Sequence, residues 1–159
     1  MNSSRQAVQV FTVSLTWLFL LALANFGEAR AVAGDLQLQA QLVWATNDPK
    51  PDGKALNDVD PKLRDKLRNV FRWTNYFEVS STNFVSVQGA VKKVPMSKHC
   101  EIEVTNLGDS RIEVKLYGKG TLVVTKRQTF NPKEPLVLAG DDKNSTAWFV
   151  AITPGKAGR

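Results

Sequence analysis

The first regular pattern in the chain is an alternation of apolar and polar residues that begins at Leu36. Apolar side chains occupy every second position from Leu36 to Trp44, and glutamines fill the positions between them up to Gln41. Such a period of two is typical of a strand with one buried face. We therefore predict a half-buried strand that stops at the turn-forming residues 46–49, followed by a surface loop that reaches Asp60.

A helical pattern follows this loop. Asp60-Pro61 provides an acidic N-cap and a proline at the first helical position. Apolar residues then recur on one side and basic residues on the other: Leu63, Leu67, Val70 and Phe71 against Arg64, Arg68 and Arg72. The spacing predicts one amphipathic helix near residues 60–73, with an apolar inner face and a basic outer face.

Beyond Trp73, short alternating runs separated by turn residues predict a series of strands. The expected strands are 76–79, 84–87, 98–105, 112–116, 121–129, 135–138 and 147–152. The expected turns include Ser81-Thr82-Asn83, 106–110, 118–120 and 140–144.

This order of elements indicates a mainly β (α+β) fold. Regularly spaced strands with Gly and Asp turns predict an antiparallel β-sandwich or small barrel with one amphipathic helix, which we expect to cover one end or one open edge. The chain has 159 residues, of which 43% are apolar. That length fits a single mainly-β domain at residues 34–159.

Residues 1–33 have a different composition. Arg5 precedes an uncharged, largely apolar run from Ala7 to Phe26, and three A-x-A motifs begin at Ala22, Ala29 and Ala31. A positive start, an apolar stretch and small residues beyond it predict a secretory signal peptide, cleaved at one of the last two motifs. The alternative is an uncleaved inner-membrane anchor formed by residues 7–26. Both interpretations place the domain outside the cytoplasm, in the periplasm or the extracellular space.

Basic residues exceed acidic ones, and the excess belongs to the domain. The whole chain carries a formal charge of +6; loss of residues 1–33 removes Arg5, Arg30 and Glu28 and leaves +5. The densest basic feature is the predicted helix face, Arg64, Arg68 and Arg72 with Lys62 and Lys66 on its flanks. Such a face can bind an anionic polymer or a membrane surface. The ordinary alternative, which the sequence favours, is a solvated outer face.

Few residues are suited to covalent or metal chemistry. Cys100 is the single cysteine and His99 the single histidine, and neighbours in a strand point to opposite faces. We therefore expect no Cys–His pair, a buried and unpaired Cys100, and no disulfide-linked partner. Asp48, Asp52, Asp58 and Asp60 match no calcium-loop spacing, and Asp141-Asp142 resembles a solvated turn. We expect no catalytic residues, no metal site and no cofactor.

The aromatic residues Trp44, Trp73, Tyr76, Phe77 and Trp148 have two interpretations. Exposed rings could stack on sugars, whereas buried rings would fill the core; positions within apolar strands favour the core.

Two segments carry a resemblance to known sequences. Residues 42–50, Leu-Val-Trp-Ala-Thr-Asn-Asp-Pro-Lys, and residues 71–77, Phe-Arg-Trp-Thr-Asn-Tyr-Phe, are similar to segments of uncharacterised small exported bacterial proteins. The resemblance implies export and a compact fold, and it implies no activity.

The sequence thus leads to three hypotheses of function. The first is an exported, non-catalytic binding or assembly module of the cell envelope, whose partner is an unknown protein or envelope component. The second is a protein that binds a polyanion, such as an acidic glycan, lipid or nucleic acid, through the basic helix face. The third is a hydrolase whose carboxylates come together only in three dimensions.

Overall fold

The computed structural model describes residues 34–53, 55–142 and 145–155. The predicted signal peptide or anchor at residues 1–33 lies outside these residues and stays a prediction. Within the described part of the chain, no helix combines the length and the hydropathy that a membrane crossing requires.

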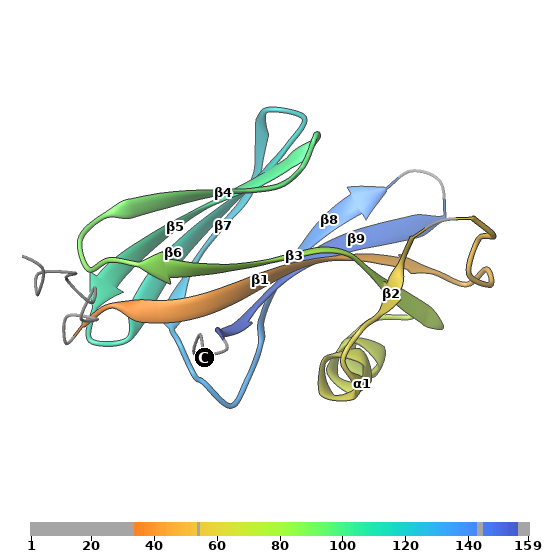
Figure 1. Ribbon diagram of the computed structural model, residues 1–159, viewed down its shortest axis with the longest axis horizontal. Coiled ribbons are helices and arrows are strands. Elements are labelled where there is room, and N and C mark those ends of the chain that lie inside the picture. The colour runs from red at the N-terminus through yellow and green to blue at the C-terminus, as the bar shows by residue number, and fades with distance from the viewer. Residues whose placement is uncertain (1–33, 54, 143–144, 156–159) are drawn as a thin grey trace, which may run out of the picture. The chain divides into compact units, whose positions relative to one another are not determined.

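Two antiparallel sheets make up the described domain (Figure 1). The five-stranded sheet has the order β2-β3-β1-β9-β8, and the four-stranded sheet is a meander in the order β4-β5-β6-β7. The strands are β1 (Leu36–Thr46), β2 (Asn57–Asp58), β3 (Asn75–Ser86), β4 (Val91–Ser97), β5 (Cys100–Gly108), β6 (Arg111–Gly118), β7 (Thr121–Thr129), β8 (Leu136–Asp142) and β9 (Thr146–Pro154). The sheets pack face to face, which confirms the predicted β-sandwich with one helix.

The helix α1 (Pro61–Val70) starts where the sequence predicts and ends three residues early. The Asp60 carboxylate accepts a hydrogen bond from the backbone N–H of Lys62, and Pro61 occupies the first turn. At the other end Phe71 is extended, with φ −120° and ψ 152°. Leu63 and Leu67 are buried as predicted, but Val70, the last residue of the helix, is 67% exposed.

Strand β3 corrects one predicted turn. Ser81, Thr82 and Asn83 lie in the middle of a continuous 12-residue strand, paired with Gln41, Ala40 and Gln39 of β1. Pairing with a long neighbour overrides the local preference of these residues for turns, since strand propensity depends strongly on context. The helix-side half and the far half of β3 are instead separated by a bulge at Val79, opposite Leu42 and Val43.

Strand β4 was not expected from the sequence. Its pattern is obscured by Lys92, Lys93 and Pro95, but the strand pairs with β5 along most of its length. Proline and lysine are tolerated here because β4 is the edge of its sheet. Two later turns agree with expectation: Asp109–Ser110 and Lys119–Gly120 have positive φ at both positions, as tight antiparallel hairpins require. The turn expected at 140–144 is wrong for Gly140, Asp141 and Asp142, because these residues continue β8 and pair with β9.

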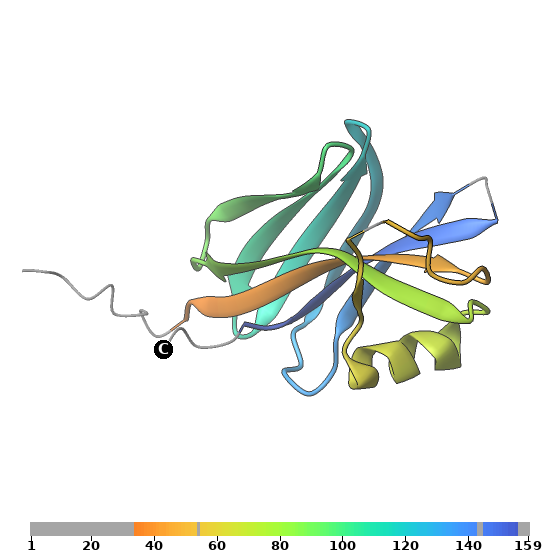
Figure 2. The ribbon, with the colours of Figure 1, turned by 45° about the vertical axis from the view of Figure 1, so that its right-hand side comes forward.

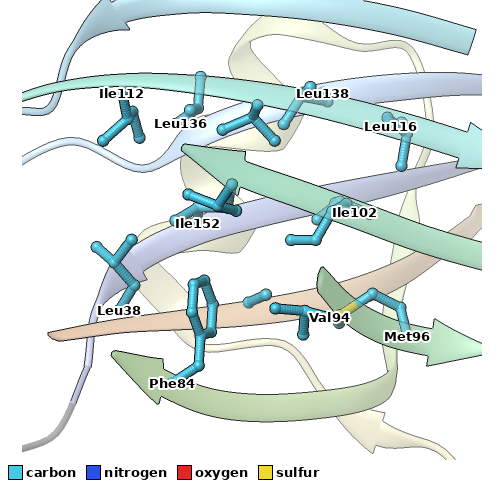
Figure 3. Close-up of a cluster of buried hydrophobic side chains, with 14 of the residues drawn as sticks. Leu38, Phe84, Val94, Met96, Ile102, Ile112, Leu116, Leu136, Leu138 and Ile152 are labelled. Atoms are coloured by element: carbon cyan, nitrogen blue, oxygen red, sulfur yellow. The ribbon is translucent and has the colours of Figure 1, made fainter. Parts of the chain in front are cut away.

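The molecule has two apolar clusters. The larger fills the space between the sheets, with side chains such as Leu38 and Ile152 facing Ile102 and Leu116 (Figure 3). The smaller lies on the other side of the five-stranded sheet, under α1 (Figure 2). Strand β1 contributes side chains to both clusters. Its side chains toward the four-stranded sheet are Leu38, Ala40 and Leu42, and those toward the helix are Val43 and Ala45.

Candidate functional site

The predicted basic face does not form one continuous stripe. Lys62, Arg64, Lys66 and Arg68 lie on α1, whereas Arg72 lies two residues beyond its end. Arg72 stacks on its neighbour, with its Cζ 4.9 Å from the centroid of the Trp73 ring. The structure therefore separates Arg72 from the helical arginines with which the sequence grouped it.

Arg68 is occupied by a local structural contact. Its Nε and one terminal nitrogen both donate to the backbone oxygen of Thr74, at 3.2 and 2.7 Å. Thr74 is also hydrogen-bonded to the loop after β1, because its backbone N–H and its hydroxyl both donate to Asn47 Oδ1. Arg68 thus fastens the segment after the helix, which reduces its availability to an anionic partner.

The remaining cations of α1 differ among themselves. Lys66 forms an ion pair with Glu134 at 3.6 Å, and both side chains are substantially exposed, so the pair adds little stability. The Nε of Arg64 is buried and finds no hydrogen-bond partner within the described structure. Lys62 lines a groove beside the start of the helix.

This groove, which we call the polar groove, is a cavity of about 780 Å³ on the outward face of the five-stranded sheet. Its floor is formed by β1, β3 and β9, through Gln39 and Gln41, Glu78 and Ser81, and Thr153. One wall is the stretch from Asp58 to Leu63, and the other is the β7–β8 connection with Pro132, Lys133 and Pro135. Its volume lies within the range usual for ligand sites.

The floor of the polar groove is polar because the outward face of β1 changes character along the strand. Val43 and Ala45 lie under α1, whereas Gln39 and Gln41 lie beyond its cover and meet the groove. The amide of Gln41 donates to a Glu78 carboxylate oxygen at 2.6 Å, and the amide of Gln39 donates to the Ser81 hydroxyl at 2.9 Å. These bonds fix both amides before any ligand arrives.

The groove also gathers charges that are distant in the sequence. Asp58, Asp60 and Glu78 contribute carboxylates, while Lys62 and Lys133 contribute ammonium groups. Pairing of β2 with β3, Asn57 with Glu78 and Asp58 with Phe77, brings the loop that carries Asp58 next to the strand that carries Glu78. The lining is therefore mixed in sign with a slight acidic excess, on a chain that is basic overall.

A second cavity, of about 530 Å³, lies at the other end of α1. Its lining is mostly apolar and consists of Val70, Phe71, Arg72, Trp73, Ala139, Gly140, Ala147 and Phe149. Phe71 packs against Phe149 with ring centroids 4.5 Å apart. This cavity is bounded by the segment that Arg68 fastens, and it offers few groups able to orient a polar ligand.

Cys100 and His99 have the predicted exposure, and Cys100 lies in a strand as predicted, but His99 does not. Cys100 is buried, unpaired and on the face of Ile102 and Val104, and burial raises the pKa of its thiol to about 11. His99 is exposed but belongs to the β4–β5 turn rather than to the strand, because Ser97 pairs with Cys100 across a tight hairpin. Among the described residues, no three His, Cys, Asp or Glu side chains are grouped closely enough to hold a metal ion.

The predicted core aromatics divide into two groups. Tyr76 and Phe77 are buried, whereas Trp44, Trp73 and Trp148 are half-buried. Trp44 stacks on Phe77 with centroids 5.9 Å apart, and Trp148 packs against the core between the sheets. None of these rings lines the polar groove, so aromatic stacking is no part of that site.

The outer face of the four-stranded sheet carries charges that are paired with one another. Glu103 contacts Lys93 and the Tyr117 hydroxyl, each at 3.0 Å, and these hydrogen bonds lower the pKa of its carboxyl. Glu113 is buried between Lys115 and Arg127. These groups therefore satisfy one another on this face.

The polar groove was not found from the sequence, although part of its signal was visible. The alternating glutamines of β1 showed that one strand face was polar, but not that a helix and a connection would border it. The described domain is thus a two-sheet β-sandwich with a helix-bordered polar groove. No known protein family, curated protein or solved structure matches the chain.

Proposed function

We propose that this protein is an exported, non-catalytic binding module of the cell envelope, and that the polar groove holds its ligand. The observation that carries the proposal is the groove itself, a concave surface with two side-chain amides fixed by hydrogen bonds. Preformed concave surfaces with oriented polar groups are the usual form of ligand sites.

The groove supports binding better than hydrolysis. It does bring carboxylates together from separate elements, as the hydrolase hypothesis requires, but two of them already have structural partners. Asp60 caps α1, and Glu78 accepts the Gln41 amide. These two carboxylates therefore already hold the start of the helix and the face of the strand in place.

The polyanion hypothesis has less support than it had from the sequence. Arg68 is committed to Thr74, Arg72 stacks on Trp73, and Lys66 pairs with Glu134. The three cations therefore lack the shared free surface that an anionic polymer would need.

The proposal can be tested by sedimenting the purified protein with insoluble envelope material from the producing cells. Ser81→Trp places a large ring on the groove floor and should abolish co-sedimentation. Val85→Trp changes another outward-facing residue of β3, which pairs with Gln37 outside the groove, and should retain it. Equal co-sedimentation of both variants would contradict the proposal, and loss only in an Arg64→Glu, Arg68→Glu variant that still folds would favour the basic face.

Export is tested separately by mass spectrometry of the mature protein. We expect an N-terminus between Asn25 and Gly34, because the uncharged run and the A-x-A motifs precede that point. An intact Met1 on the exported protein would instead favour the anchor.

A further inference from the structure

The chemistry of the polar groove also narrows the class of ligand. Its carboxylates and amide oxygens accept hydrogen bonds, and its lysines and its Ser81 and Thr153 hydroxyls donate them. A ligand that satisfies such a lining must donate and accept along its whole length. Hydroxyl groups do both, whereas phosphates, sulfates and carboxylates only accept.

The charge of the groove disfavours an anionic ligand. Asp58, Asp60 and Glu78 outnumber Lys62 and Lys133, so a polyanion would meet a slight repulsion where it makes most of its contacts. Glu78 would also form no hydrogen bond with an anion, because a carboxylate offers no donor. An uncharged ligand avoids this cost.

The topology disfavours a peptide that adds as a strand. The floor is centred on β1, which is paired with β3 on one side and with β9 on the other. The backbone groups of an interior strand are used in its ladders, so a ligand above β1 meets side chains only. Recognition through side-chain hydroxyls, amides and carboxylates is suited to a sugar rather than to an extended peptide backbone.

The walls supply the apolar contacts that a sugar ring also needs. Pro132 and Pro135 lie on one side, and Pro154 lies at the end of β9. Their C–H surfaces can pack against the C–H faces of a pyranose ring while the hydroxyls meet the floor. The pattern of a few placed polar groups among apolar surfaces is that of small-molecule sites in general.

We propose that the polar groove binds a strand of an uncharged, hydroxyl-rich polysaccharide, with Gln39, Gln41 and Ser81 making the central hydrogen bonds. This inference rests on the proposed function and specifies its ligand. Because the recognition is uncharged, the affinity should change little with salt, whereas binding to a polyanion would fall steeply between about 50 and 200 mM.

The test is calorimetric titration of the full purified protein with three neutral probes, cellohexaose, mannohexaose and hexa-N-acetylchitohexaose, and with a heparin hexasaccharide as the anionic comparison. We expect at least one neutral probe to bind at both salt concentrations, and the heparin probe to bind none or only weakly. Binding of heparin alone, or of no neutral probe, would overturn the inference.

Matched variants locate the binding. Gln39→Ala should weaken binding of the neutral probe by about tenfold, or about 1.4 kcal/mol, which is within the range for one lost hydrogen bond. Gln37→Ala alters the preceding outward-facing glutamine of β1, outside the groove, and should leave the affinity within about twofold of wild type. Equal effects of the two substitutions would overturn the assignment to the groove.

The two proposals fail in different ways. If Ser81→Trp abolishes envelope binding but no neutral hexasaccharide binds, the glycan inference is wrong and the groove remains the ligand site. If Ser81→Trp leaves envelope binding unchanged, the proposed function itself is wrong. Release of shorter sugars from a bound hexasaccharide would contradict the non-catalytic part of the proposal.

Discussion

At the scale of single residues, Gly140 is the position with least room for change. A Cβ at this residue would lie 2.1 Å from the Trp148 indole, which crosses the strand beside it. Trp148 also lies close to Gly118 of the other sheet, where a Cβ would be 3.4 Å from the ring. Two glycines thus make space for one tryptophan that contacts both sheets.

We therefore predict that Gly140→Ala lowers the free energy of unfolding by about 1–3 kcal/mol, because the indole must move. Denaturant unfolding measures the loss, and a shift in the tryptophan emission spectrum should accompany it. In a Trp148→Phe background the smaller ring should reduce the cost. An unchanged cost in that background would show that the collision with the indole is not its cause.

Cys100 gives a prediction about pH. Burial raises the pKa of its thiol from 9.0 to about 11, so the unfolded chain loses this proton before the folded chain does. The stability that the neutral thiol contributes is therefore complete below pH 9 and is lost as the pH rises toward 11. Denaturant unfolding of wild type and Cys100→Ala should show a difference that shrinks or reverses over this window. A constant difference would mean that the thiol is not shielded from solvent.

At the scale of elements, the edges of the four-stranded sheet show how the fold avoids unwanted pairing. One row crosses this sheet from β4 to β7: Lys92, Val104, Val114 and Lys126. The two valines are buried, and the lysines at both ends share their face yet remain exposed. Inward-facing charges on edge strands are a common protection against strand addition.

Replacing both edge lysines, Lys92→Val with Lys126→Val, should therefore increase self-association without lowering stability. Sedimentation velocity over a concentration series measures the association, and denaturant unfolding checks the fold. Lys98→Val, in the β4–β5 turn and at a position without positive φ, removes a lysine outside the paired strands and should remain monomeric. Association of the turn variant to the same extent would implicate net charge instead of edge protection.

The elements also show how much of the fold could be predicted from the sequence. Strand β1 and the start of α1 were predictable because their signals are local: a period of two, and a cap followed by proline. The turn at Ser81-Thr82-Asn83 was wrong and β4 was overlooked, because in both cases pairing with a neighbour decided the structure. The groove could not be predicted from local signals either, because Asp58 comes to its edge only through the pairing of β2 with β3.

At the scale of the whole molecule, the two apolar clusters differ in size and in the elements that cover them. The cluster between the sheets draws on strands of both, whereas the helix contributes only Leu63 and Leu67 as buried residues of its own. Burial of each leucine contributes about 1.5–3 kcal/mol. The helix should therefore detach at a lower free energy than the sandwich opens.

Native-state hydrogen exchange tests this expectation. Amides of 64–70 should exchange faster than those of β5 and β6, and by a local opening that is insensitive to low denaturant. Leu67→Ala should accelerate exchange in the helix far more than in the sandwich. Equal acceleration in both regions would show that helix and sandwich unfold as one unit.

The central place of β1 has a consequence for the order of events during biosynthesis. This strand lies near the start of the domain, yet one of its partners is β9, so that Leu38 pairs with Pro154. A chain that emerges N-terminus first therefore cannot close its larger sheet until the last strand is available. Contacts of such sequence separation slow folding. If export proceeds as we propose, this delay keeps the chain extended while it is threaded across the membrane and postpones closure to the far side.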